Sequence, residues 1–415
     1  MTGTDERLST RQAAERLGVK PETVYAYVSR GLLTSRKSTG GRGSTFDPKE
    51  VEALARRHSR PHAASPAGAE TGTPGTTAVR TGITFIDRDR YYYRGVDALT
   101  LAETYPYEEA ADWLWTGRIT PGLRFTAPDE LLAATSAAVA ALPSHASPVD
   151  RLRAVAVAAA AADPLRFDLS TEAVHGTARS LIAAFSGSLP IAGRTHRTDA
   201  PVARRLWARL TPAAPEPAAV RCLDTALVLL IDHDLAASTL AARVAASARA
   251  NPYAVVSTGL SALDGPLHGA ASGLAHRMLL DVLERGSAAP VVSEHFRAGR
   301  RIPGLGHRLY PGEDPRAGLL FTLLDEVPGA RRALDAAQEV VEISARHTPL
   351  HANVDLALAV LSASAGMPAE AGETVFAVAR TAGWIAHALE EYEERPLRMR
   401  PSGLYTGPRP PQPLP

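Results

Sequence analysis

The sequence contains a single cysteine, Cys222, among its 415 residues. One cysteine excludes a disulfide framework within the chain, and a reducing cytoplasm is therefore the expected compartment. We expect Cys222 itself to be a small buried hydrophobic residue.

Long apolar runs are also missing. The longest, such as residues 154–162 and 226–231, are far shorter than the roughly 18 residues that a membrane-spanning helix needs. The polar N-terminus lacks the apolar segment of a secretion signal. These features predict a cytoplasmic protein that makes no membrane contact.

Aromatic residues are scarce, at 6%, and much of the 45% hydrophobic content is alanine. Alanine-rich and leucine-rich stretches with few β-branched runs favour helices. The length predicts two or three domains. We therefore expect an all-α protein with an ample core.

The net charge is only +1, but it is unevenly distributed. Residues 1–60 hold 12 Lys/Arg against 7 Asp/Glu, whereas the remainder holds 33 against 37. Residues 1–60, called the head below, are basic and the rest of the chain is mildly acidic, which indicates that only the head binds a polyanion.

The head has the pattern of a helix-turn-helix. Ser9 or Thr10 can cap a first helix that ends at Gly18, and Pro21 suits the start of a second, which ends at Gly31. The second helix would then be free to enter a major groove. A Gly/Ser-rich stretch with Arg36, Lys37 and Arg42 would form a wing over the phosphates, and a further helix would run from Asp47 to about Arg57.

The string LSTRQAAERLGVKPETVYAYVSRGLL, followed by the Gly-rich stretch and FDPKEVEAL, resembles the MerR/excisionase-like helix-turn-helix family. The resemblance implies that residues 1–57 bind double-stranded DNA. The residues expected to contact it are Thr23, Tyr25, Arg30, Lys37 and Arg42. A small helical module that binds protein or caps the fold is the alternative, in which Val24, Tyr25 and Tyr27 are core.

Residues 58–80 are rich in Pro, Gly, Ala, Ser and Thr, and predict a flexible linker. The proline-rich tail, residues 408–415, predicts disorder. Between them we expect a short hairpin or extended piece at 83–90 and then successive helices. Their expected ranges are about 98–116, 129–142, 150–161, 171–186, 199–210, 217–250, 270–285, 316–325, 328–345, 354–365 and 370–391.

Polar residues stand at breakpoints of the second half of the chain, in GPLHG (265–269), GLGHR (304–308), DPR (314–316) and NVD (353–355). Two histidines, a carboxylate and an arginine suit carbon-acid chemistry, which needs a base, proton donors and a cation for an anionic substrate. No spacing of ligands indicates a metal site, and no dinucleotide or Walker motif is present.

These segments, with LLIDHDLAAST (229–239) and HANVDLAL (351–358), resemble motifs of the citrate synthase family in the family's order. YRG (93–95), RTAGWIAHALEE (380–391) and RPSGLYTG (400–407) extend the resemblance over about residues 80–407. It implies condensation of acetyl-CoA, or of propionyl-CoA, with oxaloacetate to give citrate or 2-methylcitrate. No metal or organic cofactor is implied.

The resemblance also implies roles for individual residues. Asp355 would be the base that removes a proton from the acyl group, and His268 would donate a hydrogen bond to the thioester oxygen. His307 would polarise and protonate the ketone. The residues implied to bind the oxo acid are His233, Arg316, Arg380 and Arg400, of which Arg400 would come from the second subunit of a homodimer.

The implied architecture has a large helical subdomain (81–263 and 366–407) and a small one (264–365) within residues 81–407. Closure of the two would expel water from the substrate. Leu230, Ser272, Ala352 and Leu356 depart from residues that are frequent in the family, which leaves the acyl-chain preference open.

Single residues among these also have purely structural interpretations. Asp355 could cap a helix, His233 could be a buried core histidine, and Arg316 could be a first-turn surface charge. An alternative for the whole protein is a DNA-binding transcriptional regulator whose synthase-like body is a metabolite sensor.

Overall fold

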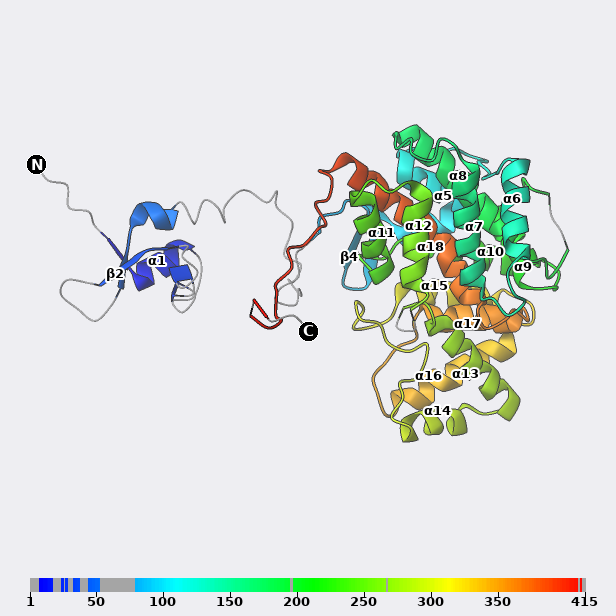
Figure 1. Cartoon of the computed structure of the whole chain (residues 1–415). Helices are drawn as coiled ribbons and strands as arrows, with labels where there is room; N and C mark the ends of the chain where they lie inside the picture. The colour runs from blue at the N-terminus through cyan, green and yellow to red at the C-terminus, as the bar shows by residue number, and fades with distance from the viewer. Residues whose placement is uncertain are drawn as a thin grey trace, which may run out of the picture. The chain divides into compact units, whose positions relative to one another are not determined.

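The structure is a computed structural model that describes residues 7–17, 24, 25, 27, 28, 33–37, 44–52, 79–194, 197–265, 268–409, 411 and 412. The chain divides into two compact units, Met1–Ala78 and Val79–Pro415. Figure 1 draws both of them.

The described part of the first unit contains one helix and a small sheet. Their bounds are β1 Leu8–Ser9, α1 Thr10–Leu17, β2 Ser35–Lys37 and β3 Ser44–Phe46. The sheet is antiparallel with β3 in the middle, so that Phe46 lies opposite both Leu8 and Ser35. The strands β2 and β3 flank the Gly/Ser-rich stretch in which a wing is expected.

A small apolar core holds this unit together. Ala13 and Ala14 of α1 are buried against Phe46 of β3 and against Val24. Val24, Tyr25, Tyr27 and Val28 have helical backbone, as the second predicted helix requires. The alternative interpretation placed Val24, Tyr25 and Tyr27 in the core. Val24 is buried there and Tyr27 packs against it, whereas Tyr25 is 50% exposed and is not a core residue.

The second unit, called the body below, begins with a short antiparallel sheet of β4 (Thr84–Asp87), β5 (Arg90–Tyr93) and β6 (Val96–Asp97). The hairpin of β4 and β5 confirms the extended piece predicted at 83–90. Side chains alternate along β5, so that Tyr91 and Tyr93 are buried.

The rest of the body is helical, as predicted. The bounds of its helices are α4 Ala98–Thr104, α5 Tyr107–Thr116, α6 Asp129–Ala140, α7 Pro148–Ala162, α8 Thr171–Ser188, α9 Val202–Leu210, α10 Pro217–Leu229, α11 Ala237–Ser247, α12 Pro252–Leu263, α13 Ala271–Arg285, α14 Ala288–Arg297, α15 Pro315–Asp325, α16 Arg331–Ala345, α17 Val354–Ser364 and α18 Ala371–Glu393.

Two of the predicted helices are wrong as single elements. Residues 98–116 form α4 and α5, because Pro106 stands between them and caps the second. The long helix expected at 217–250 is interrupted at residues 230–236. There the last carbonyl groups of α10 bond to tyrosine hydroxyl groups, and Asp234 has a positive φ of 58°.

Two further helices, α12 and α14, are absent from the predicted set. The start of each has a recognisable N-cap residue in the sequence. The Asn251 side chain accepts from the backbone N–H of Ala254, with Pro252 at the first helical position, and Ser287 caps α14 in the same way.

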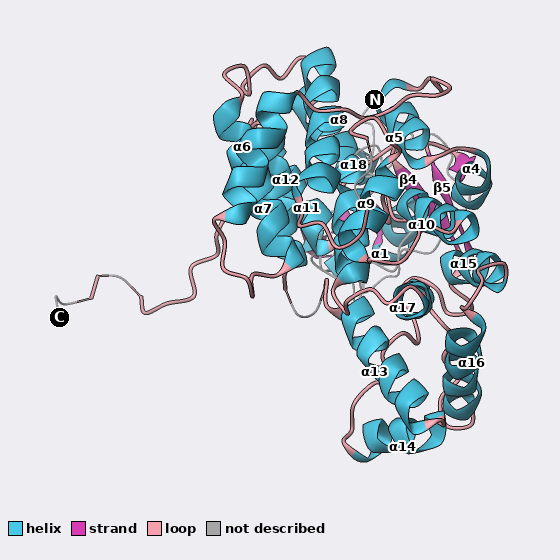
Figure 2. Cartoon of the chain, turned by 90° about the vertical axis from the view of Figure 1, so that its right-hand side faces the viewer, coloured by secondary structure: helices cyan, strands magenta, loops and turns pink. Residues whose placement is uncertain are grey.

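The long helix α18 is central to the body, where it packs against α8, α11 and α12. Figures 1 and 2 both place α13, α14 and α16 together at one end of the body, with α17 between them and the remaining helices. The segments on either side of this boundary carry the residues of interest.

Candidate active site

The turn between α10 and α11, residues 230–236, carries His233. Its side chain is 6% exposed, and its Nε2 lies 2.6 Å from the Tyr310 hydroxyl oxygen. The ring of Tyr91 meets the imidazole edge to face, with centroids 5.5 Å apart. Burial, and then the positive charge of Arg316, hold the pKa of His233 well below its usual value. The imidazole is therefore neutral near pH 7.

A second loop, residues 304–308, is joined to the segment before α17. The backbone N–H of Gly306 donates to the His351 carbonyl at 2.7 Å, and that of Asn353 donates to the Gly304 carbonyl at 2.9 Å. Gly304 and Gly306 both have φ of +79°, a conformation that glycine adopts without strain. These contacts place His307 near the start of α17.

The His307 imidazole lies between aromatic neighbours, 5.1 Å from the ring of His233 and 4.9 Å from that of Tyr310. The Leu309 N–H donates to its Nδ1 at 3.1 Å, which leaves the proton of the neutral ring on Nε2. Burial, and then Arg316, lower the pKa of His307 to about 4. It is a neutral hydrogen-bond donor.

Arg316 is buried at 2% exposure beside the residue that caps its own helix. Its Nε and Nη2 donate to the two carboxylate oxygens of Asp314, at 2.9 and 2.8 Å. Asp314 Oδ2 also accepts from the Val354 N–H at 3.0 Å. Burial opposes ionisation of Asp314, but Arg316 outweighs it and lowers the pKa of this carboxyl. Arg316 is thus a fixed buried cation rather than a surface charge.

Asp355 lies in the first turn of α17, directly after Val354, whose N–H donates to Asp314. The helix is capped by Asn353, whose Oδ1 accepts from the Asp355 N–H at 3.0 Å, so Asp355 is not the N-cap. Burial raises the pKa of Asp355 to about 6, although the charge of Arg316 lowers it. A carboxylate with this pKa is ionised at neutral pH and is a stronger base than an exposed aspartate.

His268 follows α12. Its Nε2 lies 2.7 Å from the Ser238 hydroxyl oxygen of α11, and its ring meets Phe376 edge to face with centroids 5.9 Å apart. Burial, and then the charge of Arg380, lower the pKa of His268. With Nε2 engaged by Ser238, Nδ1 is the nitrogen free for a substrate.

Arg380 of α18 completes this group. It is 1% exposed, its guanidinium lies over the Phe376 ring at 4.4 Å, and its Nε donates to the Leu230 carbonyl at 2.9 Å. Gly383, one turn further along α18, faces the Ile231 carbonyl so closely that a Cβ would not fit. The close approach of α18 brings Arg380 to the turn that carries His233.

One ring contact and the electrostatic interactions with Arg316 and Arg380 therefore link six of the seven predicted residues. They are His233, His268, His307, Arg316, Asp355 and Arg380. Arg400 follows α18 and is exposed on the single chain. Sequence reasoning missed the residues that orient them, which are Ser238, Tyr310, Asp314, Asn353 and Phe376. Three of these five, Ser238, Asp314 and Asn353, lie within the quoted motifs, and Tyr310 stands three residues after His307.

Other features add no chemistry to this group. A cavity of about 480 Å³ between α15 and α16 is lined by Asp314, Phe321 and His351 but by none of the predicted residues. Among the described residues, no three His, Cys, Asp or Glu side chains are grouped as metal ligands. No helix in the described part of the chain is long and apolar enough to cross a membrane. Cys222 is buried, as predicted.

Of the residues predicted to contact DNA, Thr23, Arg30 and Arg42 lie outside the described residues. Tyr25 is exposed, and its hydroxyl lies 3.3 Å from Thr10 Oγ1. Lys37 ends β2, where the neighbouring Arg36 is exposed.

Comparison with known proteins gives two family matches. The family described as citrate synthase, C-terminal domain, matches residues 72–402, and a helix-turn-helix domain family matches residues 7–59. Citrate synthase from Haloferax volcanii is 31% identical over 362 residues, which cover 81% of this chain and 95% of that protein. Citrate synthase 2 from Bacillus subtilis is 29% identical, with 82% and 96% covered.

Solved structures agree in fold. Citrate synthase from Thermotoga maritima superimposes with a TM-score of 0.67 at 27% identity, over 84% of this chain and 98% of that one. The enzyme from Thermoplasma acidophilum, in complex with carboxymethyl coenzyme A and oxaloacetate, has the same TM-score at 21% identity and supports the fold alone. The chain belongs to the citrate synthase family, a family of acyltransferase-type enzymes, and carries a helix-turn-helix domain before its citrate synthase-like body.

Proposed function

We propose that the body condenses acetyl-CoA or propionyl-CoA with oxaloacetate and hydrolyses the product to citrate or 2-methylcitrate and free CoA. The observation that carries the proposal is the state of three side chains. The carboxyl of Asp355 has a pKa raised to about 6, while the pKa values of His268 and His307 are lowered. One group is a base and two are neutral donors, which is the set that the reaction needs.

Asp355 takes the proton from the carbon next to the thioester carbonyl. This proton is weakly acidic, so the enolate oxygen must be stabilised as it forms. When the Ser238 hydroxyl donates to Nε2 of His268, the proton of the neutral imidazole sits on Nδ1. His268 then donates that N–H to the thioester oxygen without carrying a charge itself.

The oxo acid is held by the buried cations. Arg316 and Arg380 offer planar donor pairs to its carboxylates, and His233 adds a hydrogen bond. The Nε2–H of His307 polarises the ketone, and the enolate carbon attacks the ketone carbon. The proton then passes from Nε2 to the new alkoxide, and the imidazolate left on His307 takes a proton back from water. Water then cleaves the thioester to release CoA thiol.

Arg400 enters this site from a second subunit. It is exposed on the single chain, at two residues from Arg398, whose guanidinium is anchored to Glu391. The proposed enzyme is thus a homodimer with an incomplete site in each monomer. Closure of the small subdomain (264–365) on the large one (81–263 and 366–407) assembles the site, since His307, Arg316 and Asp355 lie on the small subdomain.

The test is release of CoA thiol by the purified protein with oxaloacetate and each thioester. Oxaloacetate-dependent release supports the proposal, and the faster thioester identifies the substrate. Absence of release with both thioesters, under conditions in which a known citrate synthase is active, would contradict it.

A second activity is favoured by the helix-turn-helix match at residues 7–59. We propose that this MerR-like head binds double-stranded DNA, alone or as the output of a body that senses oxaloacetate. Electrophoretic mobility or fluorescence anisotropy with genomic duplexes, at several salt concentrations, tests it, because phosphate contacts make affinity fall with salt. If the protein binds none of the duplexes at any salt concentration, a role of the head in assembly is favoured instead.

A further inference from the structure

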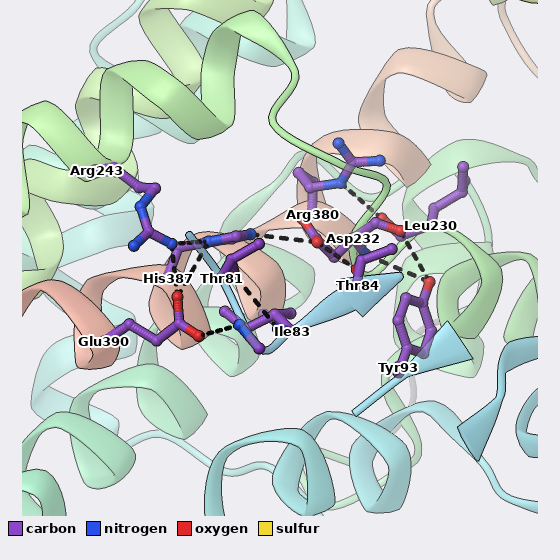
Figure 3. A network of polar contacts seen from close by, with 12 residues as sticks. Thr81, Ile83, Thr84, Tyr93, Leu230, Asp232, Arg243, Arg380, His387 and Glu390 are labelled. Atoms are coloured by element: carbon purple, nitrogen blue, oxygen red, sulfur yellow. Dashed lines mark hydrogen bonds and ion pairs between the residues drawn. The ribbon is translucent and has the colours of Figure 1, made fainter. Parts of the chain in front are cut away.

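A network of polar side chains, buried at its centre, adjoins the turn that carries His233 (Figure 3). Its members come from the strand β4, the turn after α10, and the helices α11 and α18. They are Thr84, Asp232, Arg243, His387 and Glu390. None of them belongs to the predicted site. Asp232, Arg243 and His387 are fully buried, and Glu390 is partly exposed.

Asp232 is the member next to His233 in the chain, and it is fully buried. Its Oδ2 accepts from the Thr84 hydroxyl at 2.5 Å and lies 3.2 Å from His387 Nε2. Its backbone carbonyl accepts from the Tyr93 hydroxyl at 3.1 Å. Burial opposes ionisation, but His387 and then Arg380 and Thr84 outweigh it and lower the pKa of the Asp232 carboxyl. Asp232 is therefore a buried carboxylate.

The tautomer of His387 follows from its other contact. Arg243 Nη1 lies 2.5 Å from His387 Nδ1, and a guanidinium can only donate, so Nδ1 must accept. The ring proton is then on Nε2, the nitrogen that faces Asp232. The Nε2–H is not aligned for a full hydrogen bond, so its attraction to the carboxylate is mainly electrostatic at 3.2 Å.

Arg243 is itself fixed from the far side. It is fully buried, and it donates to Glu390 Oε2 at 2.7 Å and to Glu391 Oε1 at 2.6 Å. Glu390 also accepts from the Gly82 N–H at 2.8 Å, which ties the chain before β4 to the same network. The His387 ring is thus held between a fixed cation and a buried anion.

The network and the candidate site share two elements. Asp232 precedes His233 on one turn, and His387 is two helical turns from Arg380 on the same face of α18. Arg380 donates to the Leu230 carbonyl, in the turn that Asp232 anchors, and Gly383 lies between the two contacts. Figure 3 shows Arg380 and His387 approaching Leu230 and Asp232 from one helix.

Stability alone is a poor explanation for these charges. Buried ion pairs seldom stabilise a fold more than apolar side chains of similar volume, because desolvation offsets their attraction. They do enforce one geometry, since each donor must meet its acceptor. A site that binds a small dianion through His233 and Arg380 needs such a fixed geometry.

We propose that Asp232 and His387, with Arg243 behind them, are positioning residues that hold the 230–236 turn so that His233 and Arg380 meet the oxo acid. The inference rests on the proposed function. It assigns no contact with substrate to the network. His387 acts through the Nε2–H that faces Asp232, and Arg243 acts by fixing the tautomer.

Two amide substitutions separate the roles of the two ring nitrogens. In His387→Gln the longer amide places an N–H donor near the position of Nε2, facing Asp232. In His387→Asn the shorter amide reaches only the position of Nδ1, where it can accept from Arg243, and Asp232 loses its donor. We expect His387→Asn to raise the KM for oxaloacetate by about 10- to 100-fold, the scale of a small misplacement of binding groups. Its KM for the thioester should stay within about threefold, and His387→Gln should keep most of the oxaloacetate affinity.

The controls address folding. His175→Gln removes a half-buried imidazole of α8 that packs on Trp115, a residue outside both the site and the network, and should leave both KM values unchanged. Thermal unfolding and calorimetric binding of oxaloacetate accompany the kinetics of each variant. If His387→Asn does not fold, Thr84→Val removes the other donor to Asp232 at nearly constant volume and should shift the same KM in the same direction.

Two results would overturn the inference in a wild-type protein that binds oxaloacetate and releases CoA. One is an unchanged oxaloacetate KM in folded His387→Asn and Thr84→Val. The other is an equal rise of the KM values for both oxaloacetate and the thioester in His387→Asn and in His387→Gln, as a general structural defect would cause. A wild-type protein that fails to bind oxaloacetate would overturn the proposed function, and this inference with it.

Discussion

The imidazole rings of His233 and His307 lie edge to face with their centroids 5.1 Å apart, although one belongs to the turn after α10 and the other to the loop before α15. Tyr310 contacts both rings and bonds to His233 Nε2. Two histidines with lowered pKa values and a buried arginine that acts on both form one cluster that is rich in hydrogen-bond donors.

Asp355→Asn should separate catalysis from stability. We expect turnover to fall by at least about 10³-fold, since an amide cannot accept the proton, while oxaloacetate binding persists. Because folding raises this pKa from 3.8 to about 6, wild-type stability falls as the pH rises from the first value to the second and stays reduced above it, so the variant should gain about 1–3 kcal/mol at pH 8. Denaturant unfolding measures the gain, with the exposed Asp325→Asn as control.

Below the pKa of an unfolded aspartate both states are protonated, and the stability gain of Asp355→Asn should vanish. A variant that turns over at the wild-type rate would contradict the assignment of the base. A sensor without catalysis would instead show no turnover in either protein and the same oxaloacetate affinity in both.

The pH profile should have an acid limb set by Asp355. With a pKa of about 6, kcat/KM should be level above pH 7 and should fall about tenfold per unit below pH 6. His307, whose pKa is lowered to about 4, stays neutral over this range and should add no further limb. A profile that stays level through pH 6 would show that the pKa of the base is not raised in the free enzyme.

Gly304→Ala should destabilise the body more than its backbone conformation alone explains. A Cβ there would meet Leu356 Cβ at 2.8 Å, whereas at Gly299, also with positive φ, nothing lies within 4 Å. We expect a loss of about 2–4 kcal/mol for Gly304→Ala and about 1 kcal/mol for Gly299→Ala. Equal losses in thermal unfolding would mean that the loop moves freely away from α17.

Arg316→Lys should weaken oxo-acid binding while preserving charge. An ammonium cannot form the two parallel bonds that the guanidinium makes to Asp314, so the cation loses its fixed position. We expect the KM for oxaloacetate to rise by about 10- to 100-fold, with a smaller change for the thioester. Arg331→Lys, in an exposed ion pair of α16, is the matched control and should have no kinetic effect.

Arg36→Glu tests the head. If β2 and β3 form a wing over DNA phosphates, removing this exposed cation should weaken duplex binding and reduce the slope of log affinity against log salt by about 1. The body variant Arg331→Glu should leave both unchanged. Wild-type binding that does not respond to salt would argue against phosphate contacts altogether.

The sequence by itself determined the local elements and the reactive side chains. Alanine-rich periodicity, prolines and capping residues predict most helices, including α13, α16, α17 and α18, to within a few residues. The motifs that resemble the citrate synthase family were enough to select His268, His307, Arg316 and Asp355 as candidates. The helix-turn-helix pattern of the head has the same local origin.

Only the tertiary structure decided what depends on contacts between distant residues. The helix expected at 217–250 breaks because Tyr91 and Tyr93 of β5 take up the last carbonyl groups of α10, which no local pattern records. The pKa of Asp355 depends on burial. Ser238 faces His268, and His387 faces Asp232, through packing of α11 and α18, since side chains far apart in sequence meet only when apolar surfaces are buried together.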